Sequence, residues 1–149
     1  MGWALTSNKA APEARLVTRE IPFCDPAAAF ARFSAAPFAA FLDSADQSSD
    51  QGCFSYILSD PFRILSAGEH VSVDGQIVPG DPFSVLAREL ARFRNPQAGG
   101  AAPFCGGAVG FIGYEAGRHL ERLHEPKPDD MNFPEMFMGF YDTVVAFDM

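Results

Sequence analysis

Residues 106–113 read GGAVGFIG, an apolar run with four glycines that leads into a charged stretch ending near residue 121. Glycines before a helix can cradle a phosphate, but this requires a GxxxxGK[ST] or a GxGxxG pattern. Residues 106–121 contain no Lys, Ser or Thr, and the acidic Glu115 would repel a phosphate. Glycines inside a strand instead mark a bulge or a close approach of another backbone. The pattern therefore predicts a strand over 107–113 whose glycines serve packing and carry no catalytic role.

Helix signals occur at three places in the chain. Asp25-Pro26 and Asp81-Pro82 each place a capping carboxylate before a proline at the first helical position, which predicts helices from 26 to about 35 and from 82 to about 93. A third helix is expected to begin at Tyr114-Glu115, with Leu120 and Leu123 on its apolar side. In the second helix, an apolar stripe at helical spacing is expected to face the core, with charged residues on the other faces. The stripe consists of Phe83, Leu86, Leu90 and Phe93, and the charged residues are Arg88, Glu89, Arg92 and Arg94.

Extended segments fill most of the remaining chain. The best hairpin signal is Asp74-Gly75, which lies between two short runs rich in valine and isoleucine. Strands are predicted over 37–44, 53–60, 62–67, 70–78 and 136–149, with an edge strand near 14–20 and loops over 45–52, 95–103 and 125–135. This order lacks both repeats and regular alternation of strands and helices. It predicts an α+β fold with a mostly antiparallel sheet and a few packed helices.

The charge of the chain excludes some partners. The formal net charge is −8 and Lys and Arg form no cluster, so we expect neither nucleic acid nor an anionic membrane surface as a partner. Residues 95–114 carry no charge, but two prolines and six glycines make a membrane helix a poor interpretation. Three scattered cysteines indicate reduced, buried thiols, and therefore a cytoplasmic protein without a disulfide framework.

Several motifs together resemble one enzyme family. GGAVGFIGYEAGRHLE is similar to the GG-x-x-G-x-x-GY-[DE] signature in the N-terminal domain of chorismate-using synthases, namely aminodeoxychorismate synthase component I and anthranilate synthase component I. Four further stretches resemble motifs of the same domain and occur in the same order. The resemblance spans about residues 20–149. These stretches are FLDSA (41–45), GCFSYILSDP (52–61), DPFSVLAREL (81–90) and PEMFMGFYD (134–142).

The resemblance carries implications for activity. FLDSA is closer to the aminodeoxychorismate form, which implies conversion of chorismate to 4-amino-4-deoxychorismate on the way to p-aminobenzoate and folate. The ammonia would come from a glutamine amidotransferase subunit. The catalytic residues and the glutamates that bind Mg²⁺ belong to a C-terminal domain of the family. The 149-residue chain is therefore expected to be inactive by itself and to hold no cofactor.

The resemblance also implies a ligand site in one branch of the family. Some anthranilate synthases carry an inhibitory tryptophan pocket, and Ser44, Phe54 and Ser55 match its motif positions. Two departures weaken that match: Asp43 stands where the anthranilate form has Glu, and Cys53 stands where a basic residue is common. Ser44 either caps the loop after its strand or contacts a ligand. Phe54 either belongs to the core or forms an aromatic wall.

The domain organisation follows the same resemblance. Residues 1–20 are expected to be poorly defined, and 21–149 to form the N-terminal domain of the family. The apolar last strand is typical of a domain cut from a longer protein, which would pack against its own C-terminal chorismate-binding domain. Without that domain the exposed interface is expected to cause self-association. An unrelated interaction domain is the alternative, and a structure in which strands 53–60 and 107–113 are not adjacent would favour it.

Overall fold

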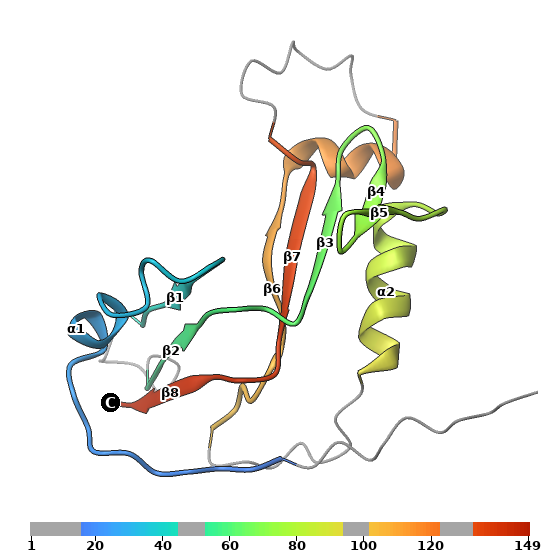
Figure 1. Ribbon diagram of the computed structural model, residues 1–149. Coiled ribbons are helices and arrows are strands. Elements are labelled where there is room, and N and C mark those ends of the chain that lie inside the picture. Colours follow the sequence, from blue (N-terminus) through green and yellow to red (C-terminus); the bar gives the residue numbers. More distant parts are fainter. Residues whose placement is uncertain (1–15, 45–52, 94–101, 123–132) are drawn as a thin grey trace, which may run out of the picture.

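The computed structural model describes residues 16–44, 53–93, 102–122 and 133–149 (Figure 1). The expected loops over 45–52 and most of 95–103 and 125–135, together with residues 1–15, lie outside this part of the chain. In chain order the elements are α1 (Pro26–Phe30), β1 (Ala40–Leu42), β2 (Phe54–Leu58), β3 (Arg63–Ala67), β4 (Val71–Val73), β5 (Gln76–Ile77), α2 (Pro82–Arg92), β6 (Gly107–Ile112), the 3₁₀ helix η1 (Tyr114–His119), β7 (Met136–Tyr141) and β8 (Val145–Asp148).

The strands form two antiparallel sheets. The smaller sheet has the order β1-β2-β8, and the larger has the order β5-β4-β3-β7-β6. Helix α2 lies against the larger sheet, while α1 lies beside the smaller one (Figure 1). The fold is therefore α+β with antiparallel sheets and few helices, which confirms the prediction.

Two segments of the chain pass from one sheet into the other. β2 leads into β3 through a bend at Asp60, whose φ of 52° is left-handed. β7 leads into β8 in the same way, so the single strand predicted over 136–149 is in fact two strands in different sheets. β2 and β6 also lie in different sheets, and the expectation that 53–60 and 107–113 are adjacent was wrong. The bend that ends β2 carries the chain away from β6.

The main core lies between α2 and one face of the larger sheet. Leu65, Met136 and Phe140 of the sheet are at most 1% exposed, and Val85 of α2 is fully buried against them. The buried residues of α2 are Pro82, Val85 and Glu89, so the face that meets the sheet is shifted around the helix from the predicted stripe. Phe83 and Leu86 of the expected stripe are partly buried against this core, whereas Leu90 and Phe93 are 41% and 45% exposed.

The helix starts predicted at Asp25 and Asp81 and the hairpin predicted at Asp74-Gly75 are confirmed. The Asp25 carboxylate accepts the Ala28 N–H at 2.8 Å, and the Asp81 carboxylate accepts two N–H groups at the start of α2. In the hairpin, Asp74 and Gly75 have φ values of 50° and 76°, the two left-handed residues that a type I′ turn requires.

Other local predictions were wrong. α1 ends at Phe30 and not near 35, and residues 16–20 form no strand. The third predicted helix is a 3₁₀ helix, whose one buried residue is Ala116, and Leu120 beyond it is 72% exposed. Leu123 lies outside the described residues. Among the cysteines, Cys24 is exposed and the other two are half-buried.

Glycines within β6 and immediately before it serve packing, as predicted. A Cβ atom on Gly110 would overlap the carbonyl oxygen of Phe137 and lie 2.9 Å from the Cα atom of Met138. At Gly106, whose φ is +136°, it would lie 2.8 Å from the carbonyl oxygen of Tyr141. The glycines allow the backbones of β6 and β7 to approach closely.

The corner between the two sheets is held by Tyr141. Its side chain is buried, and its hydroxyl donates to the carbonyl oxygen of Phe38 at 2.8 Å. Next to this contact, the Asp60 N–H donates to the carbonyl oxygen of Pro37 at 3.0 Å. Burial raises the pKa of Tyr141 above its ordinary value, so the hydroxyl stays a donor at neutral pH. The turn at 37–38 is thereby held to the end of β7 and to the bend between β2 and β3.

Replacing Tyr141 with phenylalanine is expected to lower the free energy of unfolding by about 1 kcal/mol, because the Phe38 carbonyl loses its donor while the ring still fills its place. Urea denaturation measures this difference. Tyr114→Phe is the matched control, since Tyr114 is 81% exposed and should change stability by less than about 0.5 kcal/mol. Equal effects of the two changes would show that the corner does not depend on this hydrogen bond.

Candidate functional site

The predicted site residues lie where the end of β1 meets the start of β2. Ser55 donates its hydroxyl to the Asp43 carboxylate at 2.9 Å and accepts the Ser44 N–H at 3.2 Å. The Ser44 hydroxyl donates to the carbonyl oxygen of Phe54 at 2.5 Å. We call Asp43, Ser44 and Ser55 the serine cluster. The structure therefore brings together Ser44 and Ser55, and adds Asp43 to them.

The strand register explains why these residues meet. Leu42 pairs with Tyr56, and continuing the same antiparallel register places Asp43 opposite Ser55. Ser55 is fully buried, and a buried hydroxyl is normally hydrogen-bonded. Its donor and one acceptor position are both used within the serine cluster. The arrangement ties the end of β1 to β2 and satisfies the buried hydroxyl.

Phe54 points away from this cluster. Neighbouring residues of a strand face opposite sides of the sheet, so the rings of Phe54 and Tyr56 share the side that Ser55 does not. The two rings stack at a centroid distance of 6.1 Å, and Tyr56 meets Phe104 edge-on at 5.6 Å. Phe54 is half-buried and not part of the fully buried core. The Ser44 hydroxyl hydrogen-bonds to the backbone carbonyl of Phe54.

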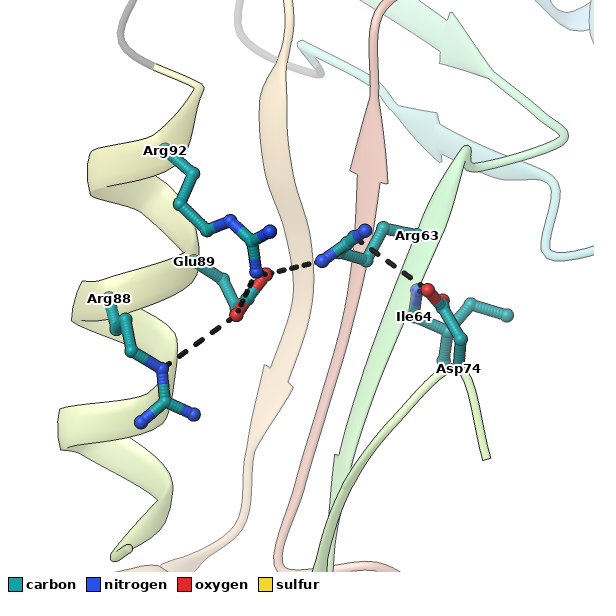
Figure 2. Close-up of polar contacts among 6 residues, drawn as sticks. All are labelled: Arg63, Ile64, Asp74, Arg88, Glu89 and Arg92. Carbon is teal, nitrogen blue, oxygen red and sulfur yellow. Dashed lines mark hydrogen bonds and ion pairs between the residues drawn. The ribbon is translucent and has the colours of Figure 1, made fainter. Parts of the chain in front are cut away.

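A second group of polar residues joins α2 to the larger sheet (Figure 2). Glu89 is 2% exposed, and its carboxylate accepts a hydrogen bond from the Arg63 guanidinium at 2.6 Å and from Arg92 at 3.2 Å. The Arg63 guanidinium also lies 3.7 Å from the Asp74 carboxylate and 5.3 Å from the centre of the Phe93 ring. This Arg63–Glu89 network was missed from the sequence, where Glu89 was placed on a different face of the helix from the one expected to meet the core.

The charge of Glu89 is stabilised by these contacts. Burial acts to raise the pKa of Glu89, but the hydrogen bonds from Arg63 and Arg92 and their positive charges lower it below its ordinary value. A buried acid with a shifted pKa is a candidate for catalysis. Here both oxygens are taken up by arginines, so the network is a structural contact between α2 and β3. The spacing of Pro82, Val85 and Glu89 along one helix face is the sequence signal that could have identified it.

His70 and His119 lie at the surface, with no arrangement of neighbours in the described part of the chain that suggests catalysis. His119 Nε2 lies 3.0 Å from Glu135 Oε2, and His70 is mostly exposed. Both border a shallow groove that also includes Ile77 and Gly80 and contains no Ser or Cys. In the described ranges no three His, Cys, Asp or Glu residues are placed to hold a metal ion. His124 lies outside these ranges.

The chain is similar to known proteins both in fold and in sequence. No protein-family model matches the chain. Among solved structures, it is similar to anthranilate synthase component I from Streptococcus pneumoniae TIGR4, with a TM-score of 0.58 and 25% identity over 70% of this chain and 23% of that one. Over 129 residues it is 27% identical to anthranilate synthase component 1 of Acetivibrio thermocellus, a match that covers 83% of this chain and 26% of that protein.

The chain is thus a homologue of the component I chains of chorismate-family synthases, which confirms the resemblance found in the sequence. Within that group it is 31% identical over 125 residues to aminodeoxychorismate synthase component 1 of Escherichia coli (strain K12), a match that covers 80% of this chain and 28% of that protein. The chain spans about a quarter of the length of the curated relatives it matches. Every helix in the described ranges is too short or too polar to cross a membrane.

Proposed function

We propose that this chain is the N-terminal, non-catalytic part of an aminodeoxychorismate synthase component I. The observation that carries the proposal is its 30–31% identity, over 80% of the chain, to aminodeoxychorismate synthase component 1 of three bacteria. The aspartate of FLDSA, which the resemblance associates with this branch, supports it further. Residues 21–149 would form the family's N-terminal domain.

The proposed reaction would require a further domain and a second subunit. A C-terminal chorismate-binding domain would hold Mg²⁺ and replace the chorismate hydroxyl by an amino group, which yields 4-amino-4-deoxychorismate for p-aminobenzoate and folate synthesis. A glutamine amidotransferase subunit would supply the ammonia. The part described by the structure would be a scaffold for that domain, in the cytoplasm. The hydrogen bonding within the serine cluster, whose members satisfy the buried Ser55 hydroxyl, supports a scaffold role.

A pair of chimeric enzymes tests this proposal. Residues 16–149 replace the matching N-terminal part of the Escherichia coli aminodeoxychorismate synthase chain, or that of the Pseudomonas aeruginosa anthranilate synthase chain, which is 28% identical. We expect the first chimera to restore growth without p-aminobenzoate and the second to fail without tryptophan. The reverse result would assign the chain to the anthranilate branch. Amination of chorismate by the 149-residue chain alone, with ammonia and Mg²⁺, would overturn the scaffold role.

A second candidate function is the N-terminal part of an anthranilate synthase component I with a feedback tryptophan pocket. The observation in its favour is that Ser44 and Ser55 meet in space. Against it, Ser55 is fully buried and bonded to Asp43, and Phe54 lies on the other side of the strand.

Titration calorimetry with tryptophan separates the two functions. We expect no saturable heat at millimolar tryptophan, because the polar groups of the serine cluster already bind one another. Saturable heat that is lost in Ser55→Ala but kept in Ser72→Ala would instead support the tryptophan pocket. Ser72 is the control because it lies in β4 of the other sheet.

A further inference from the structure

The outer edge of β6 has an unusual composition for an exposed strand. β6 is the last strand of the larger sheet, and in the described part of the chain no strand pairs with its outer side (Figure 1). Soluble proteins usually protect such an edge with a charge, a proline or a very short strand. β6 has six residues and contains neither a charge nor a proline. The other edge strands are shorter: β5 has two residues, β1 three and β8 four.

The register identifies the backbone groups that point outward. The Gly113 N–H donates to the carbonyl oxygen of Glu135 at 2.7 Å, so the residues two and four positions before Gly113 also turn their N–H and C=O groups toward β7. The residues between them turn theirs to the free edge. These outward residues are Ala108, Gly110 and Ile112.

We propose that β6 pairs with β6 of a second copy of this chain, in antiparallel orientation, about a two-fold axis at Gly110. This register places Gly110 opposite its own copy and Ala108 opposite Ile112, so all outward groups of both strands are paired. A register shifted along the strand leaves some of them unpaired. A two-fold axis requires a self-complementary surface, and an antiparallel strand edge has this property.

Side chains and charge favour the same arrangement. On the face away from α2, Val109 of one copy would lie beside Phe111 of the other in a narrow, non-hydrogen-bonded pair, where side chains approach closely. Phe111 is 41% exposed and Ile112 is 49% exposed, so both have area to bury. The net charge of −8 opposes association elsewhere, but residues 107–113 carry no charge. The proposal does not depend on the proposed function.

Analytical ultracentrifugation of the 149-residue chain and two variants tests the pairing. The wild type is expected to reach twice the mass of one chain as concentration rises. Ile112→Lys should shift the dissociation constant at least tenfold toward monomer, because it places a charge at the pairing edge. Ile77→Lys is the matched control: Ile77 is also exposed, at 70%, but lies at the opposite edge of the same sheet, so this variant should dimerise like the wild type.

Amide hydrogen exchange of the wild type gives a second test that needs no variant. Exchange at Ala108, Gly110 and Ile112 should slow as concentration rises, while exchange at Gln76 and Ile77 should stay constant. A monomeric wild type at all concentrations overturns the proposal. So does a dimer that Ile112→Lys and Ile77→Lys weaken equally, or a dimer without slower exchange in β6.

Discussion

Replacing Gly110 with alanine is expected to lower the free energy of unfolding by about 3 kcal/mol, the upper end of the usual range for overpacking. The new Cβ atom would overlap the Phe137 carbonyl oxygen and lie 2.8 Å from its carbonyl carbon. These are backbone atoms of β7, which β3 holds from the other side, so they cannot move away as a flexible side chain could. β6 would have to separate from β7.

Gly68→Ala is the control for this change. It makes the same substitution in the same part of the fold, at the end of β3, but its Cβ atom would meet nothing within 4 Å. We expect a change of less than about 0.5 kcal/mol. Urea denaturation followed by circular dichroism compares both variants with the wild type. If the two glycines give the same loss of stability, the close approach of β6 and β7 does not explain Gly110.

Replacing Arg63 with alanine is expected to have a similar or larger effect, about 3–5 kcal/mol, because it leaves the buried Glu89 carboxylate without its nearest cation. Glu89 retains Arg92 at 3.2 Å, but that arginine extends from the solvent side of α2 and is 58% exposed. Arg118→Ala is the control. It removes an ion pair with Glu115 at the surface, where the Arg118 and Glu115 side chains are 27% and 46% exposed, and should cost no more than about 1 kcal/mol.

The effect of Arg63→Ala should depend on pH in a defined direction. The pKa of Glu89 lies below its ordinary value of 4.5, since the arginines outweigh the effect of burial. A carboxyl group with a lowered pKa in the folded state stabilises the protein above its unfolded pKa, and this contribution is lost as pH falls through the folded pKa.

In the variant, burial raises the pKa of Glu89 again, so the carboxyl becomes neutral at a higher pH. The difference in unfolding free energy between wild type and variant should therefore be largest at neutral pH and shrink as pH falls through the pKa of Glu89 in the variant toward its lower pKa in the wild type. A difference that stays constant from pH 7 to about pH 3.5 would show that Arg63 acts through its alkyl chain and not through the ion pair.

The features that the sequence determined by itself are those in which a few neighbouring residues decide the backbone. Asp25 and Asp81 cap helices because the capping carboxylate and the N–H groups that it accepts lie within three residues of each other. Asp74-Gly75 forms its turn because both residues tolerate left-handed angles. The motif order also identified the family, which the comparisons confirm.

The tertiary structure decided the features that depend on distant parts of the chain. The strand predicted over 136–149 divides because its neighbour, the β2–β3 segment, bends at Asp60 and the pairing follows that bend. α2 buries Glu89 because Arg63, 26 residues earlier in the chain, offers a cation at that position on the sheet. The sequence motifs predicted Ser44 and Ser55 as site residues, but only the β1–β2 register placed Asp43 beside them. Local sequence patterns encode secondary-structure propensity, whereas strand pairing and side-chain burial depend on which segments of the chain meet in space.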